Sequence, residues 1–411
     1  MNNTPVYLDH AATTDINRAA LAVLSEQMTR TGNPSSLHGA GRQANRVVDD
    51  ARGQIARAAG AHPSEVVFTS GGTESDNLAL KGLYWNRRAA NPQTRLILLS
   101  GMEHHAVLDT AEWLQAHEGA ELCWMPVDAD GVLDLHSAMA LIDEHAERIA
   151  LVTLMWANNE VGSVQPVPAL AEYAAGYGIP LHTDAVQAFT SVPTDFATSQ
   201  AATMAISAHK IGGPVGIGAL LVRRDIVLTP VQHGGGHERK LRSGTLNAAL
   251  AAGFGIAAQE ASGHREAESS RLGALRDRAV AAIAELIPEA VLNGPADPGG
   301  TGKRLPGNLH YTFPGCEGDS LLFVLDMLGI HSSTGSACTA GVPQPSHVLL
   351  AMGRDARTAR SVQRFTFGHS TSDADVDKLL EALPEAYARA KKAGMAADES
   401  SIRTAGTGFT R

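Results

Sequence analysis

Short apolar runs rich in β-branched residues alternate with longer helix-compatible segments between about Glu65 and Arg224. This alternation is typical of a parallel β-sheet that is covered by helices. The predicted strands are EVVFT, RLILLS, ELCWMPV, RIALVTLM, IPLHT, ATMAIS and IGALLVRR. We therefore predict an α/β protein whose large domain holds a mostly parallel, seven-stranded sheet.

The second half of the chain follows a different order. A charged, alanine-rich segment over residues 257–286 predicts a long helix at a domain boundary. After it come a Gly/Pro-rich loop, the strand NLHYTF, the helix DSLLFVLDMLG, a cysteine-containing loop, the strand VQRFTFG and a final helix. This order predicts a smaller α+β domain. We assign 16–260 to the large domain, 1–15 and 261–395 to the small domain with the cysteine loop, and 396–411 to a flexible tail.

The composition indicates a folded protein whose partners are small molecules and other proteins. The chain has 411 residues, of which 44% are hydrophobic and 18% charged, and its formal net charge is -10. Such a charge disfavours broad binding to DNA or to anionic membranes. No apolar run approaches the roughly 18 residues of a membrane helix, and the first residues lack a basic region followed by an apolar stretch. We expect no membrane span and no export.

The three cysteines, Cys123, Cys316 and Cys338, form no close pair and no regular framework. This usage favours a reducing compartment, so we expect a cytoplasmic protein. Cys123 lies in a predicted strand and is expected to pack in the interior, whereas Cys316, in FPGCEGDS, is expected to be half exposed. Cys338 lies in SSTGSACTAGVPQPSH, whose small residues, glycine and proline predict an exposed loop. Unpaired cysteines are usually buried hydrophobes, so the loop alone does not decide whether Cys338 is functional.

Polar residues cluster directly after five of the predicted strands. The segments are SGGTES, GMEHHA, WANNEVG, DAVQA and AHKIGGPVG. Ligands bind outside the C-terminal ends of parallel strands in open α/β sheets. We predict that these five loops form one functional site.

Lys210 and Asp184 follow two of these strands, and together they suit pyridoxal phosphate. A partly desolvated lysine loses some preference for its charged form, and its neutral amine forms a Schiff base with an aldehyde. A carboxylate at a neighbouring strand end holds a pyridinium nitrogen protonated. Taken singly, Lys210 also fits a surface position and Asp184 a helix cap. Their combination favours the cofactor.

A phosphate-binding segment is predicted in SGGTESDNLALKG. It offers a glycine turn, the hydroxyls of Ser70, Thr73 and Ser75, and the N-terminus of a following helix. Ser207 and His209, beside the lysine, supply further donors.

Two histidine segments are less decisive. His104 or His105, in MEHHAVLD, suits stacking on an aromatic cofactor and proton transfer, and equally suits a helix cap or a surface position. HGGGHE, from His233 to Glu238, has residue types that bind metals, but its three glycines disfavour the helix that would align them. We expect no metal site.

The motifs as a set resemble one enzyme family. They are YLDHAATT, GNPSSLH, FTSGGTESDNLALKG, EHHAVLD, NNEVG, DAVQ, SAHK, HGGGHERKLRSGT and STGSACT, and they run in family order from about Tyr7 to about Ala393. This set is similar to that of the IscS/NifS-like cysteine desulfurases, which are pyridoxal 5'-phosphate enzymes of the class V aminotransferase family. The resemblance implies the fold type I architecture of pyridoxal-phosphate-dependent transferases.

The resemblance also implies roles at the cofactor. Lys210 would carry it covalently, Asp184 would pair with its pyridine nitrogen, and His104 would stack on its ring and take part in catalysis. The remaining cofactor-binding residues would be Gly72, Thr73, Asn159, Gln187, Ser207 and His209, with Thr73, Ser207 and His209 at the phosphate.

The substrate and the partner subunit are implied in the same way. Arg364, in VQRFTFG, would clamp the substrate carboxylate, a bidentate task suited to arginine, and Asn33 and Asn159 would contact the substrate beside it. Thr245, in RSGT, would reach the phosphate of the partner subunit, which implies a homodimer with shared sites.

The implied activity converts L-cysteine to L-alanine. Sulfur would pass to the Cys338 thiolate as a persulfide, and then to an acceptor protein such as an iron-sulfur scaffold or a tRNA-thiolation enzyme. Two alternatives stay open at this point. A selenocysteine lyase or another class V enzyme would share the scaffold without using Cys338, and a non-catalytic sulfur-transfer scaffold would not take up the cofactor.

Overall fold

The computed structural model describes residues 5–335 and 345–405, with 394–405 described by the backbone alone. The largest sheet has seven strands in the order β2-β8-β7-β6-β5-β3-β4. Strand β8 pairs antiparallel with both of its neighbours, and the other pairs are parallel. The predicted α/β fold with a mostly parallel, seven-stranded sheet is therefore confirmed. The strands are β2 (Val66–Thr69), β3 (Leu96–Ser100), β4 (Glu121–Met125), β5 (Ile149–Thr153), β6 (Leu181–Asp184), β7 (Thr203–Ser207) and β8 (Gly218–Val222).

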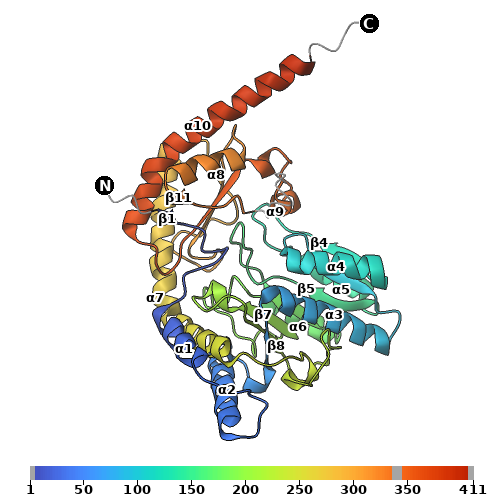
Figure 1. The fold of residues 1–411 in the computed structure, drawn as a ribbon. Coiled ribbons are helices and arrows are strands. Elements are labelled where there is room, and N and C mark those ends of the chain that lie inside the picture. The colour runs from blue at the N-terminus through green and yellow to red at the C-terminus, as the bar shows by residue number, and fades with distance from the viewer. Residues whose placement is uncertain (1–4, 336–344, 406–411) are drawn as a thin grey trace.

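Helices bury both faces of this sheet. The helices around it are α1 (Arg18–Met28), α2 (Gly39–Ala59), α3 (Gly72–Ala90), α4 (His105–Glu118), α5 (Leu135–His145), α6 (Val167–Gly176) and α7 (Ala248–Leu286). On β3, Leu96 and Leu98 belong to a hydrophobic cluster that includes residues of α2, α5 and α6, whereas Ile97 and Leu99 belong to a cluster that includes residues of α3 and α4. Side chains along a strand alternate between the two faces of the sheet, so the continuous apolar runs of the sequence fill the hydrophobic clusters on both faces of this sheet. Figure 1 shows the resulting layers in the lower part of the molecule.

Helix α7 connects two separate hydrophobic cores. It spans 39 residues. Its first part packs Ala251 and Phe254 against the large sheet, and its later part packs Leu272 and Leu275 into the second core. The long helix predicted over 257–286 is present, and it begins earlier, at Ala248.

The second core lies around a three-stranded antiparallel sheet in the order β12-β10-β9. Strand β1 pairs parallel with β11 beside it. Val6 and Leu8 are buried in this core, so the start of the chain lies with its last third. The domain limits inferred from the sequence stay a prediction. The other strands and α-helices of the chain are β1 (Val6–Tyr7), β9 (Val291–Leu292), β10 (Asn308–Thr312), β11 (Ile330–His331), β12 (Val362–Thr366), α8 (Gly318–Met327), α9 (His347–Ala351) and α10 (Asp373–Ala405).

Helix α10 continues to Ala405, so residues 396–405 of the predicted flexible tail are helical. The flexibility of the tail stays a prediction. Alanine, glutamate and arginine in this stretch favour a helix, and extending a helix that is already formed costs little. Residues 406–411 lie outside the described part of the chain.

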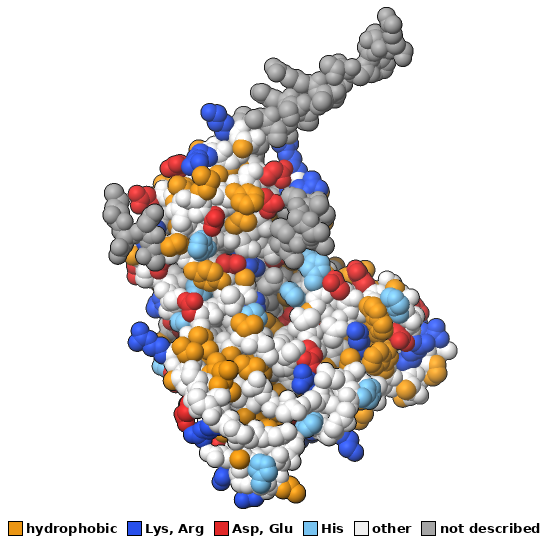
Figure 2. All heavy atoms as spheres, in the orientation of Figure 1, with side chains coloured by type: hydrophobic (Ala, Val, Ile, Leu, Met, Phe, Trp, Pro, Cys, Tyr) orange, Lys and Arg blue, Asp and Glu red, His pale blue; other side chains and the backbone are white. Residues whose placement is uncertain are grey.

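Two surface observations bear on partners. None of the helices within 5–335 and 345–405 is long and apolar enough to cross a membrane. On the face shown in Figure 2, acidic and basic side chains are interspersed with hydrophobic and neutral polar ones, so charge of one sign is not concentrated there.

Candidate active site

Loops at the C-terminal ends of the parallel strands converge on one cavity of about 410 Å³. Small-molecule sites are expected at this edge of an open α/β sheet. Most of the residues selected from the sequence line the cavity. They are Gly72, Thr73, His104, Asn159, Asp184, Gln187, Ser207, His209, Lys210 and Arg364.

Lys210 ends a short 3-10 turn (Ala208–Lys210) that follows β7. Its Nζ atom donates to the backbone carbonyl oxygens of Ala11 and Ala12, the second at 2.7 Å. Burial and the nearby Arg364 guanidinium lower the pKa of Lys210 to about 8, against opposing contributions from acidic neighbours. The amine therefore has an accessible neutral form, which the chemistry inferred from the sequence requires.

Asp184 is the last residue of β6 and is buried. Its Oδ1 atom accepts a hydrogen bond from the backbone N–H of Val186 at 2.8 Å. Burial raises the pKa of Asp184, while His104 and Lys210 oppose that rise. A buried carboxylate of this kind is stabilised by a cationic group placed in the cavity.

His104 caps helix α4. Its Nδ1 atom accepts from the backbone N–H of Ala106 at 3.0 Å, so the proton of the neutral ring sits on Nε2. Burial lowers the pKa of His104 and favours this neutral form. His105 instead lies outside the cavity, half exposed, beside Asp109. The structure thus separates two residues that their positions in the chain left equivalent, and His104, the one that the resemblance selects, combines the cap with a place in the cavity.

The start of helix α3 forms one wall. No side chain of the described residues caps this helix, so its first backbone N–H groups are available at Gly72 and Thr73. A Cβ atom on Gly72 would lie 2.7 Å from a methyl carbon of Val186, so a larger residue here would require Val186 to shift. Ser207 is buried, and its hydroxyl finds no hydrogen-bond partner among the described residues. Ser75, expected to be a phosphate donor, is turned inward and donates to the carbonyl of Gly71 at 3.0 Å.

Arg364, on β12, brings a buried guanidinium to the cavity from the second core. Its Nη1 atom donates to the carbonyl oxygen of Asn159 at 2.9 Å, and its Nη2 atom donates to Asp9 Oδ1 at 2.8 Å. Gln187 donates from Nε2 to the carbonyl of Ala11 at 2.8 Å. Sequence reasoning assigned no role to Asp9, and its place in YLDHAATT was the only signal.

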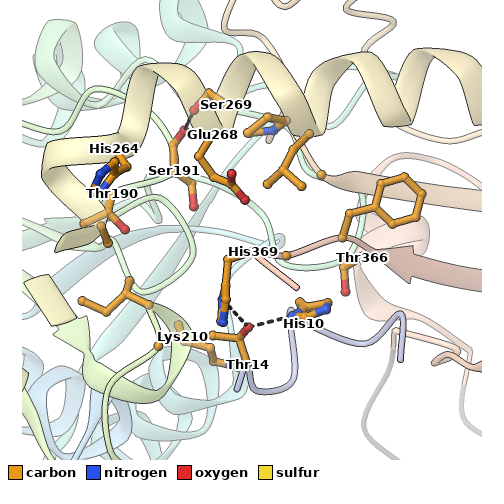
Figure 3. A pocket seen from close by; sticks show the side chains of 18 of the residues that line it. His10, Thr14, Thr190, Ser191, Lys210, His264, Glu268, Ser269, Thr366 and His369 are labelled. Atoms are coloured by element: carbon orange, nitrogen blue, oxygen red, sulfur yellow. Dashed lines mark hydrogen bonds between the residues drawn. The ribbon is translucent and has the colours of Figure 1, made fainter. Parts of the chain in front are cut away.

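A second cavity, of about 670 Å³, lies next to the first and shares Ala11 and Gln187 with it (Figure 3 shows this second cavity). Lys210 lines both cavities. In the second cavity, His10 and His369 point toward the Thr14 hydroxyl, with His10 Nδ1 at 2.7 Å from it. Burial lowers the pKa of His10 to about 4, so this ring is neutral at physiological pH.

Two buried acids near the cavity escaped the sequence reasoning. Asp76 lines the cavity, and its Oδ1 atom lies 3.1 Å from Nε2 of His182. Glu103 accepts a hydrogen bond from the backbone N–H of Met155 at 2.8 Å, and burial raises its pKa to about 8. Both residues lie within the sequence motifs named above. Their burial could not be predicted from those motifs, because it depends on how distant segments pack around them.

Asn33 and Thr245 do not line the cavity of this chain, and both are exposed. His237 connects the loops that carry them. Its Nε2 atom lies 3.0 Å from the hydroxyl of Ser35, and its Nδ1 atom accepts from the backbone N–H of Gly244 at 3.2 Å. The roles inferred for Asn33 and Thr245 stay predictions.

The cysteines divide three ways. Cys338 lies outside the described residues. Cys316 is only 3% exposed, so its expected half exposure is wrong. Its Sγ atom donates to the carbonyl of Phe313 at 3.2 Å, and burial raises its pKa to about 12, because the loop folds onto the second core. Cys123, on β4, packs against the large core but is only partly buried, less than the interior position expected of it.

Comparisons with known proteins agree with the fold. The aminotransferase class-V family matches residues 6–379. The IscS-like cysteine desulfurase of Mycobacterium tuberculosis is 51% identical over 391 residues, which cover 95% of this chain and 98% of that protein. The cysteine desulfurase NifS of Azotobacter vinelandii is 38% identical, with 93% of each chain covered.

Solved structures give the same result. A NifS-like protein superposes with a TM-score of 0.83 at 32% identity, covering 93% of this chain and 99% of that one. SspA in complex with cysteine superposes with a TM-score of 0.74 at 32% identity, covering 88% of this chain and 98% of that one. The chain therefore belongs to the class-V aminotransferases and, within them, to the cysteine desulfurases.

Proposed function

We propose that this chain converts L-cysteine to L-alanine with pyridoxal 5'-phosphate and passes the sulfur to Cys338. The observation that carries the proposal is the convergence of Lys210, Asp184 and Arg364 on one cavity. These side chains supply a reactive amine, a partner for a ring cation and a carboxylate clamp. Selenocysteine lyases and other class V enzymes need the same three groups, so the role of Cys338 distinguishes them.

The residues present fit the cofactor. Among the described residues, the Ser207 hydroxyl has no hydrogen-bond partner and the start of α3, at Gly72 and Thr73, has no side-chain cap, so both suit the phosphate. The buried carboxylate of Asp184 suits a protonated ring nitrogen, and His104 and Gln187 lie along the same cavity. When bound, pyridoxal phosphate supplies an aldehyde that reacts with amines and a ring that withdraws electrons from the substrate Cα.

The chain's own residues would then bind and deprotonate the substrate. Arg364 binds the substrate carboxylate through N–H groups that Asp9 and Asn159 leave free. Lys210, with its pKa lowered to about 8, accepts the Cα proton at Nζ and returns it. His104, neutral with its proton on Nε2, is placed to serve as a donor at the cavity wall.

Sulfur transfer needs one further nucleophile, which we assign to Cys338. Its Sγ forms a bond to the substrate sulfur while the substrate Cβ–S bond breaks. The electron pair of that bond stays with Cβ, and a proton completes the methyl group of L-alanine. The products are L-alanine and a persulfide on Cys338, so atoms and electrons balance without an added oxidant.

We further propose that two copies of the chain share their sites. Asn33 and Thr245 are exposed, lie away from their own cavity and are joined through His237. Because these two predicted site residues face outward, they are better placed to reach the site of a neighbouring copy than the cavity of their own chain.

The persulfide would pass to an acceptor protein such as an iron-sulfur scaffold or a tRNA-thiolation enzyme. The cysteine usage supports a reducing compartment, and we propose the cytoplasm.

The test compares wild type with Cys338→Ala while sulfide and L-alanine are measured from L-cysteine in the presence of a reductant. Equal amounts of both products from wild type, and a yellow but inactive variant, are expected. A variant that desulfurates like wild type would remove Cys338 from the mechanism. A wild-type protein that takes up no pyridoxal phosphate would overturn the proposal as a whole.

A further inference from the structure

We propose that Asp9 is a positioning residue that orients Arg364 for the carboxylate of the substrate. The inference rests on the proposed function, because it concerns how L-cysteine is held.

The first observation is how the guanidinium is held. Asp9 Oδ1 accepts from Nη2 of Arg364 at 2.8 Å, and the Asn159 carbonyl accepts from Nη1 at 2.9 Å. The two terminal nitrogens thus have different partners, which together fix the plane of the group. Arginine has five N–H donors, so each terminal nitrogen keeps one for a ligand. The Nε atom is buried without a partner among the described residues, so the group still has unused donors.

The second observation is that backbone pairing fixes Asp9 itself. Asp9 forms a parallel bridge with Thr366, which lies two residues after Arg364 on β12. The Thr366 N–H donates to the carbonyl of Leu8 at 2.7 Å, and the N–H of Ala11 donates to the Thr366 hydroxyl at 2.9 Å. Strand geometry therefore places the carboxylate and the guanidinium side by side before any ligand arrives.

The third observation is burial. The Arg364 side chain is 5% exposed and that of Asp9 is 21% exposed. At this depth the Arg364 guanidinium is poorly solvated, so removing the Asp9 charge would leave a buried cation without compensation. The guanidinium would then reorient or draw in water. Asp9 also offsets the effect of Arg364 on Lys210, because the two act on the Lys210 pKa with opposite sign.

The consequence is that the Arg364 guanidinium is already oriented for a carboxylate before the ligand binds. Ligands that carry a carboxylate should gain from the fixed guanidinium, since the ordering has been completed before binding. Amines that lack a carboxylate should gain nothing from Asp9.

The test uses the cofactor-loaded enzyme and a matched pair of ligands, L-alanine and ethylamine, which differ only in the carboxylate. Binding of each is followed by the change in visible absorption. For Asp9→Asn we expect L-alanine to bind about tenfold more weakly, the effect of losing one charged hydrogen bond, and ethylamine to change by less than about twofold. The KM for L-cysteine should rise about as much as the L-alanine dissociation constant, while kcat changes less.

A double-mutant cycle tests whether Asp9 acts on the ligand through Arg364. In an Arg364→Gln background, adding Asp9→Asn should weaken L-alanine no further. Asp15→Asn is the matched control, because Asp15 lies on the same segment but accepts from the Ser370 hydroxyl at 2.9 Å. If Asp9→Asn does not fold, Asp9→Glu replaces it, with a smaller loss expected for L-alanine only.

Equal weakening of L-alanine and ethylamine would overturn the proposal, because it would indicate a general structural role. So would an undiminished Asp9 effect in the Arg364→Gln background. If wild type binds L-alanine but releases no sulfide from L-cysteine, the proposed function fails while the Asp9 test can still be read.

Discussion

The Nζ atom of Lys210 lies 2.7 Å from the backbone carbonyl oxygen of Ala12. Ala12 belongs to the N-terminal segment, which begins in the second core with Val6 and Leu8. The contact holds the amine in a buried place where its pKa is lowered to about 8 from the ordinary 10.5. Only a neutral amine attacks an aldehyde, so the fraction able to react rises with pH through this value.

The apoenzyme should therefore take up pyridoxal phosphate at a rate that rises with pH and levels off above a midpoint near 8. Stopped-flow absorbance over a pH series measures it, with a simple alkylamine as reference. Arg364→Gln should move the midpoint upward, because the Arg364 guanidinium lowers the Lys210 pKa. A midpoint near 10.5 would contradict the burial argument.

Arg364→Lys should raise the KM for L-cysteine by about ten- to a hundredfold, with a smaller fall in kcat. Lysine keeps the charge, but as a single point it cannot contact Asp9, Asn159 and a carboxylate in the same plane. Steady-state kinetics measure the split between KM and kcat. Arg360→Lys is the control, since Arg360 is exposed on the turn just before β12. An unchanged KM would remove Arg364 from substrate binding.

Lys210→Ala and Thr245→Ala should each be inactive alone, yet a mixture of the two should recover activity. In a mixed dimer, one site would combine Lys210 from one copy with Thr245 from the other. Random reassortment would restore up to about a quarter of the wild-type activity, since half of the dimers are mixed and each has one intact site. Native mass spectrometry verifies that mixed dimers form. Mixed dimers without activity would show that Thr245 serves its own chain.

Cys316 should resist iodoacetamide in the native protein at mildly alkaline pH. The residue is 3% exposed and the pKa of its thiol is raised to about 12, so little thiolate is present and access is closed. Peptide mass spectrometry of the alkylated protein locates the modified cysteines. Cys316→Ser should keep sulfur transfer, in contrast to Cys338→Ser. Rapid labelling of Cys316 would show that its loop opens.

The fold should lose stability as the pH falls from about 6.5 toward 3, in part through His182 and His310. Burial lowers the pKa of each to about 3 from 6.5, so within this range the unfolded chain binds protons that the folded chain does not. The contribution is complete above 6.5 and is lost as the pH approaches 3. His310→Gln should make the slope of unfolding free energy against pH shallower by on the order of 1 kcal/mol per pH unit. Urea unfolding at several pH values measures the slope, and His264→Gln, at an exposed position, should leave it unchanged.

Local sequence signals determined the architecture. Apolar runs such as LILLS and IALVT are long enough and sufficiently β-branched to predict buried strands, and their order predicts a mostly parallel sheet. The residues directly after those runs could be assigned to one edge, because parallel strands end on the same side. Lys210 and Asp184 were found in this way, since each requires only its neighbours in the chain, whereas the choice of His104 over His105 came from the resemblance.

Contacts between distant segments could not be predicted in that manner. Asp9 lies 355 positions from Arg364, and its carboxylate becomes a partner only because β12 pairs with the start of the chain. The inward turn of Ser75 and the burial of Cys316 likewise depend on what packs over them.

The sequence by itself thus determined the strands, their succession along the chain and the chemical groups that follow them. These features depend on periodicity and residue type over short stretches. Only the tertiary structure decided which groups meet, which are desolvated and which face outward, as Asn33 and Thr245 do. Those properties arise from the joint packing of two cores around a cavity, and no single segment contains that information.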